Sequence, residues 1–563
     1  MARGLAGLAL AAAAPTVTAQ LPPALDTVEV RSSAGVVVAN TREAAEAGAM
    51  LLRAGGNAVD AAAAAALALG VSEPEASSLG GSVWMLIHLA RGVDIFVDGS
   101  AAVPAAADPE VLEALRTAGV NVGYASVAVP GGLAAIAHAV EHYGTRPFAE
   151  VVAPAVALAE NGIILPPHGL AVLENFRSRL LGSPTLTGIF LDESLVLRPA
   201  DHLICQPALA RTLRVLARLG AAEFYRGEIA ATMAADITAN GGFVHTADLE
   251  AMRALERAPL HGRYRGFDIV ASPPPGAGAA VIEALHILGR FPPERLAAAD
   301  PGSRTLTLEA VRIALADLLL AVAHPPLQAL LVDKGHAARR ATLIRGDRAL
   351  RADEIVPRPG AAAMRGSTHL SVVDAAGNAV SLSQSINHEF GAGVATPELG
   401  FPYNSSLSLF DGRDPSGPFY PRPGNLLSPT MAPMIVLRHG RPMLVIGSPG
   451  SSRIVSVVTQ VIVNVVDRGM SLADAVAAPR TVWAVDGSPH AAIEVAGVGA
   501  DETVAALERF GYPSVYTLCF PPRPIDLMYF GGANCAGVDP RTGDIVGVGD
   551  PRRAGWAASG DPR

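Results

Sequence analysis

The segment of this chain that is best suited to catalytic chemistry contains a serine directly after a glycine. Residues 366–387 read GSTHLSVVDAAGNAVSLSQSIN. The Ser367 hydroxyl is a weak nucleophile at neutral pH unless a base lies within hydrogen-bond distance. If the Gly366–Ser367 peptide bond were cut, the new α-amine, with an ordinary pKa of about 8, would supply that base. An ordinary strand start with surface hydroxyls explains the same local pattern.

The residues around Ser367 predict a β-hairpin. Residues 369–373 and 379–387 alternate polar and apolar side chains, which is typical of strands, and a Gly-Asn pair lies in the turn between them. In such a hairpin Ser385 and Asn387 lie near Ser367 on the partner strand. We therefore expect a second hydroxyl and an amide beside the candidate nucleophile.

A glycine-rich turn is a second candidate for chemistry. Residues 447–454, GSPGSSRI, follow predicted strands at 434–438 and 443–446 and lead into a predicted helix that ends near Asp467. The first backbone N–H groups of a helix have no partner within it, so such a turn is a natural site for an oxyanion. A plain helix start is the alternative interpretation.

Apolar periodicity predicts the elements that surround these segments. Thr41 should cap a helix that runs to Arg53. The next helix, through Leu69, is Ala- and Leu-rich on all sides, so we expect it to be fully buried. Further predictions are a strand at 83–89 and helices at 133–143, 148–161, 279–288 and 303–323.

The segments at 366–374 and 377–387 resemble the start of the small subunit of the γ-glutamyltransferase family. Members of that family are N-terminal-nucleophile hydrolases that cut themselves in two. The resemblance implies that Ser367 is the nucleophile, at a position where the family normally has Thr. Thr368 is the rival nucleophile if the cut lies one residue later.

Further motifs extend the resemblance from about residue 33 to residue 555. They lie at 55–62, 79–81, 390–393, 478–480 and 549–552. By the resemblance, the amides of Gly450 and Ser451 hold the oxyanion, while Ser385 and Asn387 orient the nucleophile and its amine. The implied fold is α+β, a four-layer αββα sandwich, whereas composition alone favours only α/β or α+β. The implied chemistry needs no metal and no organic cofactor.

The resemblance also implies a large subunit of residues 21–366 and a small, catalytic subunit of residues 367–563, which associate with each other in one αββα unit. Residues 1–20 carry one Arg before an apolar run too short to span a bilayer, which is typical of a bacterial signal peptide. That prediction implies a periplasmic or secreted protein. A disordered extension from a misassigned start, and with it a cytoplasmic protein, is the alternative. Residues 335–365 carry no strong pattern, which fits the free end of the large subunit or a long linker.

Composition indicates a globular protein. Half of the 563 residues are hydrophobic, 17% are charged, the net charge is −9, and Lys and Arg form no clusters, which argues against nucleic-acid binding. Beyond the N-terminal segment no stretch reaches a transmembrane length. The three cysteines have no metal-binding spacing, and the sequence leaves open whether Cys519 and Cys535 pair. The expected partner is a small-molecule amide.

The departures from the family pattern concern recognition of the γ-glutamyl group. The position of the family's carboxylate-binding Arg aligns with Ser100. The two positions that bind the ammonium group align with Ser406 and Leu409, and a serine pair aligns with Pro429 and Thr430. A charged group left unpaired in a buried site costs several kcal/mol. We therefore expect a γ-glutamyl donor to bind poorly and Leu409 to make the acyl pocket more apolar.

Three functions remain open from the sequence. The first is a hydrolase or acyltransferase for a γ-glutamyl or similar, glutathione-like amide. The second is an acylase or amidase for a non-glutamyl group, such as a dicarboxylic or β-lactam side chain. The third is an uncleaved, inactive relative that serves as a binding protein.

Overall fold

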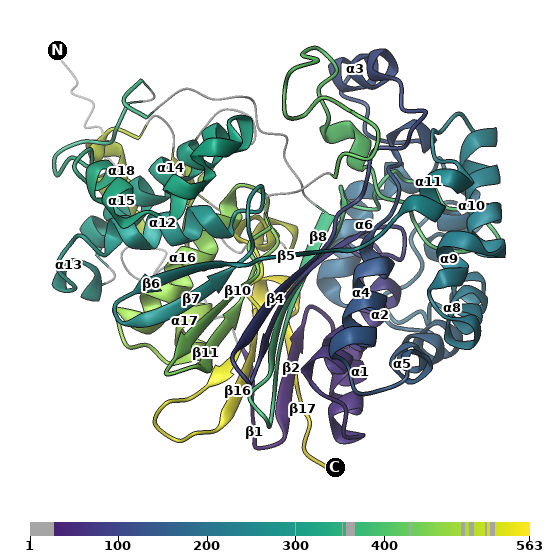
Figure 1. The fold of residues 1–563 in the computed structure, drawn as a ribbon, viewed down its shortest axis with the longest axis horizontal. Coiled ribbons are helices and arrows are strands. Elements are labelled where there is room, and N and C mark those ends of the chain that lie inside the picture. Colours follow the sequence, from purple (N-terminus) through teal and green to yellow (C-terminus); the bar gives the residue numbers. More distant parts are fainter. Residues whose placement is uncertain are drawn as a thin grey trace, which may run out of the picture.

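Two seven-stranded sheets face each other, and helices cover the outer face of each sheet (Figure 1). The computed structural model describes residues 27–298, 300–351, 353–355, 366–426, 431–485, 490–494, 500–512, 515–517 and 524–562. The arrangement confirms the four-layer αββα sandwich that the resemblance implies. The predicted signal peptide at 1–20 lies outside the described residues.

The first sheet contains the predicted hairpin at its centre. All of its neighbouring strands pair antiparallel. In spatial order it consists of β17 (Trp556–Ser559), β2 (Gly35–Ala39), β8 (Gly366–Asp374), β9 (Ala379–Asn387), β3 (Ser82–Leu89), β4 (Val93–Gly99) and β5 (Leu255–Arg257).

The second sheet is also antiparallel throughout. Its order is β1 (Val28–Ser32), β16 (Ile545–Gly549), β15 (Cys535–Val538), β11 (Arg441–Ile446), β10 (Met434–Arg438), β7 (Phe267–Ala271) and β6 (Leu260–Tyr264). A small third sheet comprises β12 (Thr481–Ala484), β13 (His490–Ile493) and β14 (Val515–Thr517). Both large sheets take strands from before and after Gly366, so the two predicted subunits are interleaved.

Each large sheet has its own helical layer. The first sheet is covered by α1 (Arg42–Arg53), α2 (Ala58–Ser72), α4 (Gly132–Tyr143) and α5 (Phe148–Asn161), and the second by α12 (Gly278–Leu288), α14 (Pro301–Ala323) and α16 (Arg453–Val466) (Figure 1). Every residue of α2 is buried, as its apolar surface predicts. Among the described residues, no helix has both the length and the hydropathy needed to cross a bilayer.

The remaining helices extend these layers. They are α3 (Pro109–Thr117), α6 (Pro167–Leu180), α7 (Pro184–Phe190), α8 (Pro207–Leu219), α9 (Ala222–Arg226), α10 (Glu228–Ala239), α11 (Thr246–Ala251), α13 (Glu294–Ala297), α15 (Lys334–Ala341), α17 (Leu472–Ala477), α18 (Ala500–Phe510) and α19 (Pro524–Leu527). A short 3₁₀ helix, η3, covers Ser406–Leu409.

Helix α15 corrects the expectation that residues 335–365 have no regular structure. The Asp333 side chain caps the helix by accepting a hydrogen bond from the His336 amide. Arg340 then makes two hydrogen bonds to the Asp317 carboxylate on α14, at 2.7 and 2.8 Å. A contact with a distant helix stabilises this segment, so its local sequence shows little sign of it. Residues 356–365, the rest of the predicted linker, lie outside the described residues.

Asp374 links the hairpin to the helical layer. One carboxylate oxygen accepts hydrogen bonds from the amides of Ala376 and Asn378 in the hairpin turn, each at 2.9 Å. The other accepts from the Ala58 amide in the first turn of α2, at 3.0 Å. Because Asp374 is only 6% exposed, water cannot readily replace these bonds.

Asp374→Ala should lower the melting temperature of the protein. The substitution leaves the buried Ala58 amide without an acceptor, which costs about 1–3 kcal/mol, and also removes the acceptor of the Ala376 and Asn378 amides in the turn. Differential scanning fluorimetry measures the effect. Asp268→Ala is the matched control, because Asp268 is half exposed and makes only a surface ion pair with Arg263. Equal shifts for the two variants would contradict the anchoring role of Asp374.

Candidate active site

Ser367 lies in a chain of hydrogen bonds that ends on the carbonyl of the preceding residue. Its Oγ lies 2.8 Å from Ser385 Oγ, which in turn lies 2.6 Å from the Gly366 carbonyl oxygen. Ser385 Oγ also accepts a hydrogen bond from the Asn387 amide at 2.9 Å. A serine hydroxyl has one proton. If Ser385 donates that proton to the Gly366 carbonyl, Ser367 must be the donor to Ser385. The chain therefore polarises the Gly366 carbonyl and draws the proton away from Ser367.

The backbone at Gly366 leaves no room for a side chain. A Cβ atom added there would lie 2.1 Å from the His388 carbonyl oxygen. The pairing of β8 and β9 also shifts between Gly366 and Ser367, as in a β-bulge. Such irregularities re-aim side chains next to active sites. Here the close approach fixes the bond between Gly366 and Ser367 against β9.

Asn387 pairs with Gly366 in the hairpin and has a left-handed backbone, with φ of +80°. Its Nδ2 donates to the Ser405 carbonyl oxygen at 2.9 Å and lies 3.2 Å from Ser408 Oγ. Its Oδ1 is buried and accepts no hydrogen bond within the described part of the chain. The side chain therefore has an unused acceptor close to the candidate cleavage site.

The alternation of β8 places Ser367 and Thr368 on opposite faces of the sheet. Leu370 and Val372 pack in the core beneath α2, whereas Ser371 donates to the Val445 carbonyl oxygen of the second sheet. Successive side chains on a strand point to opposite faces. Ser367 therefore faces the second sheet and Thr368 faces the helices. Only Ser367 shares a face with the turn at 447–452, which follows β11.

The turn at 447–452 lies beside β8 and β9. A Cβ at Gly447 would lie 2.4 Å from the His369 ring, and Ser381 Oγ donates to the Ile446 carbonyl oxygen at 2.9 Å. Gly450 and Ser451 have φ values of +132° and +58°. Neither of their amides donates to an acceptor among the described residues. A left-handed Ser costs about 1–2 kcal/mol, a strain that is typical of functional sites.

Arg553 is a further part of the site that sequence reasoning missed. Its buried guanidinium donates to the Ser367 carbonyl oxygen at 3.2 Å and to the Met528 carbonyl oxygen at 3.4 Å. Burial lowers the pKa of Arg553, while the nearby carboxylates, Glu73 first, oppose that shift. The motif at 549–552 ends one residue earlier and is the signal that pointed to this region.

The motifs at 478–480 and 549–552 meet in a buried ion network. Asp550 pairs with Arg480 at 2.5 Å and with Arg552 at 3.2 Å, and all three side chains are at most 2% exposed. Asp550 also accepts a hydrogen bond from the Ala533 amide at 2.7 Å. The neighbouring Gly532 amide donates to Ser448 Oγ at 3.1 Å. The network therefore supports the turn that carries Gly450 and Ser451. Removing one partner from a buried pair typically costs 3–5 kcal/mol.

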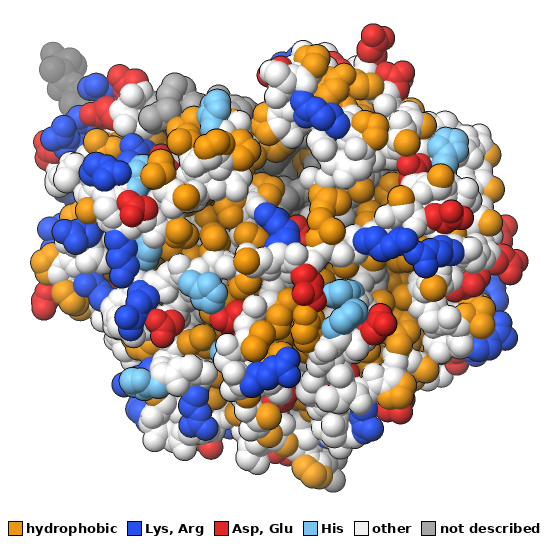
Figure 2. Space-filling model, in the orientation of Figure 1, with side chains coloured by type: hydrophobic (Ala, Val, Ile, Leu, Met, Phe, Trp, Pro, Cys, Tyr) orange, Lys and Arg blue, Asp and Glu red, His pale blue; other side chains and the backbone are white. Residues whose placement is uncertain are grey.

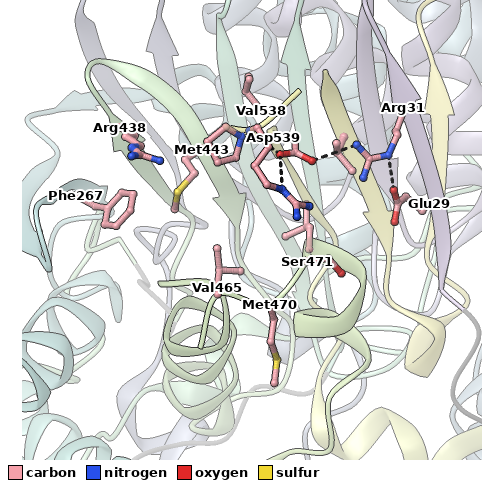
Figure 3. Close-up of a pocket in the computed structure, with 16 residues that line it drawn as sticks. Glu29, Arg31, Phe267, Arg438, Met443, Val465, Met470, Ser471, Val538 and Asp539 are labelled. Atoms are coloured by element: carbon pink, nitrogen blue, oxygen red, sulfur yellow. Dashed lines mark hydrogen bonds and ion pairs between the residues drawn. The ribbon is translucent and has the colours of Figure 1, made fainter. Parts of the chain in front are cut away.

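Two concave regions of the described part of the chain bear on the position of the site. In the orientation of Figure 1, the face is hollowed between the α14 side and the α3 side, over the start of β8, and hydrophobic side chains lie on both walls (Figure 2). A separate pocket of about 240 Å³ is lined by residues that include Phe267, Arg438, Met443 and Met470 (Figure 3). It lies near the start of β11, whereas the turn at 447–452 follows the end of that strand. None of the predicted site residues lines this pocket.

A family model described as Gamma-glutamyltranspeptidase matches residues 44–560. The chain belongs to the γ-glutamyltranspeptidase family. It is 34% identical over 550 residues to the Acylase ACY 1 proenzyme of Pseudomonas sp. (strain V22), covering 94% of this chain and 93% of that protein. It is 34% identical over 480 residues to the Glutathione hydrolase proenzyme of Escherichia coli (strain K12), covering 80% of this chain and 81% of that protein.

Solved structures of the family have the same fold. Cephalosporin acylase from Bacillus halodurans superposes with a TM-score of 0.84 at 26% identity, covering 98% of this chain and all of that one. Gamma-glutamyltranspeptidase from Helicobacter pylori superposes with a TM-score of 0.53 at 29% identity, covering 56% of this chain and 93% of that one. As a member of the γ-glutamyltranspeptidase family, this protein is an N-terminal-nucleophile enzyme.

The residues predicted to contact the acyl group lie in different settings. Ser100 is buried, donates to Asp98 Oδ1 at 2.5 Å and accepts from Trp84 Nε1 at 2.8 Å. Ser406 is buried at the start of η3. Leu409 is half buried at the end of η3 and packs against two hydrophobic clusters. Of the aligned serine pair, both Pro429 and Thr430 lie outside the described residues, as does Cys519.

Ser385→Ala should slow self-cleavage of the enzyme by about 10²-fold or more. The substitution removes the only described side-chain group that contacts both Ser367 Oγ and the Gly366 carbonyl oxygen, and loss of one oxyanion donor costs about that factor. Densitometry of the intact chain against time measures the rate. Ser385→Thr retains the hydroxyl and should cleave far faster than Ser385→Ala. Equal rates for the two variants would exclude the proposed role of the hydroxyl.

Proposed function

We propose that this enzyme uses Ser367, freed by self-cleavage, to hydrolyse or transfer the acyl group of a γ-glutamyl or similar amide. The observation that carries the proposal is the hydrogen-bonded chain from Ser367 through Ser385 to the Gly366 carbonyl. That hydrogen-bonded chain draws the proton from the Ser367 hydroxyl and at the same time polarises the Gly366 carbonyl. Ser367 is therefore the proposed nucleophile both in self-cleavage and in the reaction with a substrate.

Self-cleavage begins with attack of Ser367 Oγ on the Gly366 carbonyl carbon. The hydroxyl proton leaves through Ser385, whose own O–H stabilises the developing oxyanion on Gly366. Collapse of the intermediate breaks the peptide C–N bond, protonates the nitrogen and leaves an ester on Ser367 Oγ. Water then hydrolyses the ester to give a Gly366 carboxylate and a free Ser367 hydroxyl. The N-to-O acyl shift itself consumes no water, and hydrolysis of the ester consumes one water molecule.

The mature enzyme repeats this chemistry on a substrate. The neutral α-amine of Ser367 accepts the hydroxyl proton as Oγ attacks the substrate carbonyl. The amides of Gly450 and Ser451 hold the oxyanion, each contributing about 3 kcal/mol when well placed. The amine then gives its proton to the leaving group, and water or an acceptor amine removes the acyl group. The unused Oδ1 of Asn387 is suited to accept a hydrogen bond from the α-ammonium group.

A second candidate function, an acylase for a non-glutamyl amide, is favoured by the acyl-binding positions. The Ser100 hydroxyl is neutral and donates its one proton to Asp98, so it offers a substrate carboxylate neither a countercharge nor a hydrogen-bond donor. Leu409 offers an apolar surface where the family binds an ammonium group. Names of relatives support both functions, since they include acylases and glutathione hydrolases.

We also propose the processing and location that the sequence implies. Cleavage before Ser367 gives subunits of residues 21–366 and 367–563, which stay associated because each large sheet contains strands of both. The proenzyme names of the relatives support this arrangement. Removal of residues 1–20 as a signal peptide places the enzyme in the periplasm or outside the cell.

Ser367→Ala should remain one intact chain on a denaturing gel, whereas Thr368→Ala should still cleave. The reason is that only the Ser367 hydroxyl bonds to Ser385, while Thr368 lies on the other face of β8. Wild-type protein should give a band of 197 residues, the span 367–563, whose terminal sequence begins with Ser. Cleavage of Ser367→Ala, or a terminus at Thr368, would refute the assignment.

Wild-type enzyme should hydrolyse glutaryl-p-nitroanilide with at least a tenfold higher kcat/KM than γ-glutamyl-p-nitroanilide. The two substrates differ only in the α-amino group, and leaving that ammonium unpaired costs at least about 1.4 kcal/mol. Leu409→Asp is the matched variant, and its new carboxylate should move the ratio towards the γ-glutamyl substrate. A wild-type preference for the γ-glutamyl substrate would favour the first function and remove the second.

A further inference from the structure

A buried group of metal-ligand types lies next to β8, outside the machinery described above. Glu73 and Glu75 follow the end of α2, and His168 lies in the first turn of α6; we call these three residues the Glu-Glu-His cluster. They are 1%, 4% and 5% exposed. One ligand atom from each residue lies within 4.8 Å of those of the other two. The positions are up to 95 residues apart, so the fold brings them together.

His168 has no partner for either ring nitrogen within the described part of the chain. Its Nε2 lies 3.9 Å from Glu75 Oε1, which is beyond hydrogen-bond distance. Glu73 Oε2 is likewise buried and unpartnered, although Glu73 Oε1 accepts from Asn40 at 2.8 Å. A polar group buried without a partner costs about 1–3 kcal/mol. One ring nitrogen of His168 and one oxygen of Glu73 therefore lie at the cluster without a hydrogen-bond partner, which indicates a missing ligand beside them.

Charged groups of both signs surround the cluster. Glu73, Glu75, Glu389 and Arg453 all act on the Arg553 guanidinium, and Glu389 also acts on Arg179. Three carboxylates and three guanidinium groups therefore lie in this region. The cluster itself offers two carboxylates and one imidazole, and a metal binds imidazole in its neutral form.

We propose that Glu73, Glu75 and His168 bind one divalent transition metal ion. Imidazole nitrogen together with carboxylate oxygen suits Zn²⁺ or Mn²⁺ better than Ca²⁺ or Mg²⁺, which prefer oxygen ligands alone. Three protein ligands, with metal–ligand distances of about 2.0–2.2 Å, match the donor set of many zinc sites. Closing the 3.9 Å separation of Glu75 and His168 to about 3 Å requires only a small side-chain movement.

The proposed ion has a structural role. Thr368 faces the Glu73 carboxylate, whereas Ser367 points to the opposite face of β8. The ion would join the end of α2 to the start of α6 directly behind the nucleophile strand. It takes no part in the acyl-transfer steps. Its loss should therefore change stability first and leave the kind of reaction unchanged.

Metal content tests the proposal on the full-length protein. The protein is stripped with EDTA, incubated with ZnCl₂ or MnCl₂, desalted, and measured by inductively coupled plasma mass spectrometry. Wild type should retain one equivalent of one of these ions, and His168→Ala and Glu75→Gln should lose it. Glu75→Gln preserves side-chain size, so the test survives if His168→Ala does not fold. EDTA should lower the melting temperature of wild type but not of Glu75→Gln, because an ion bound only by the folded state stabilises it.

The pair of partly buried His138 and exposed His142 on α4 provides the control. Their rings stack with centroids 4.1 Å apart, so this pair is a plausible adventitious zinc site. His142→Ala should leave the retained equivalent in place. Loss of the metal in His142→Ala alone would overturn the proposal. So would a wild-type protein that retains no more metal than Glu75→Gln, which would mean that a proton shared by Glu73 and Glu75 balances the cluster.

Discussion

The register between β8 and β9 is the constraint on which the rest of the site depends. It sets Ser367 opposite Ser385 and Gly366 opposite Asn387. A slip of one residue would turn every side chain of β8 to the other face of the sheet. The buried apolar residues beneath α2 and the turn held by Asp374 both prevent that slip. Packing that stabilises the sandwich therefore also aims the nucleophile.

The two sheets contribute different parts of the chemistry. The hairpin carries Ser367, the proposed nucleophile, and Ser385, which is proposed to take its proton, whereas strand β11 of the second sheet leads into the turn with Gly450 and Ser451. Between the sheets, small hydroxyl side chains lie beside the apolar residues that the two sheets pack together. Ser371 and Ser381 donate to carbonyl oxygens of β11, which lets the sheets approach closely. The active site is in this sense a continuation of the sheet-to-sheet interface.

Local patterns predicted much of the fold and part of the site. The hairpin, the buried helix α2 and the glycine-rich turn each have a periodicity or composition that is visible over ten residues. Family resemblance was needed to interpret Ser367 as a nucleophile. Arg553 and the Glu-Glu-His cluster could not be predicted, because their contacts join residues about 90 to 190 positions apart. Ser100 shows the same limit: alignment marked the position, but only the structure reveals that Asp98 and Trp84 occupy its hydroxyl.

Because strands from both sides of Gly366 are interleaved, the proposed cleavage would change how the protein can refold. The strands β2 and β3, from before Gly366, flank β8 and β9 within one hydrogen-bonded sheet. An intact chain can place all four of these strands side by side by folding within a single molecule. After the proposed cleavage, the same arrangement could be regained from denatured fragments only by collision of two separate polypeptides. The proposed cleavage would therefore convert a folding reaction that does not depend on protein concentration into one that does.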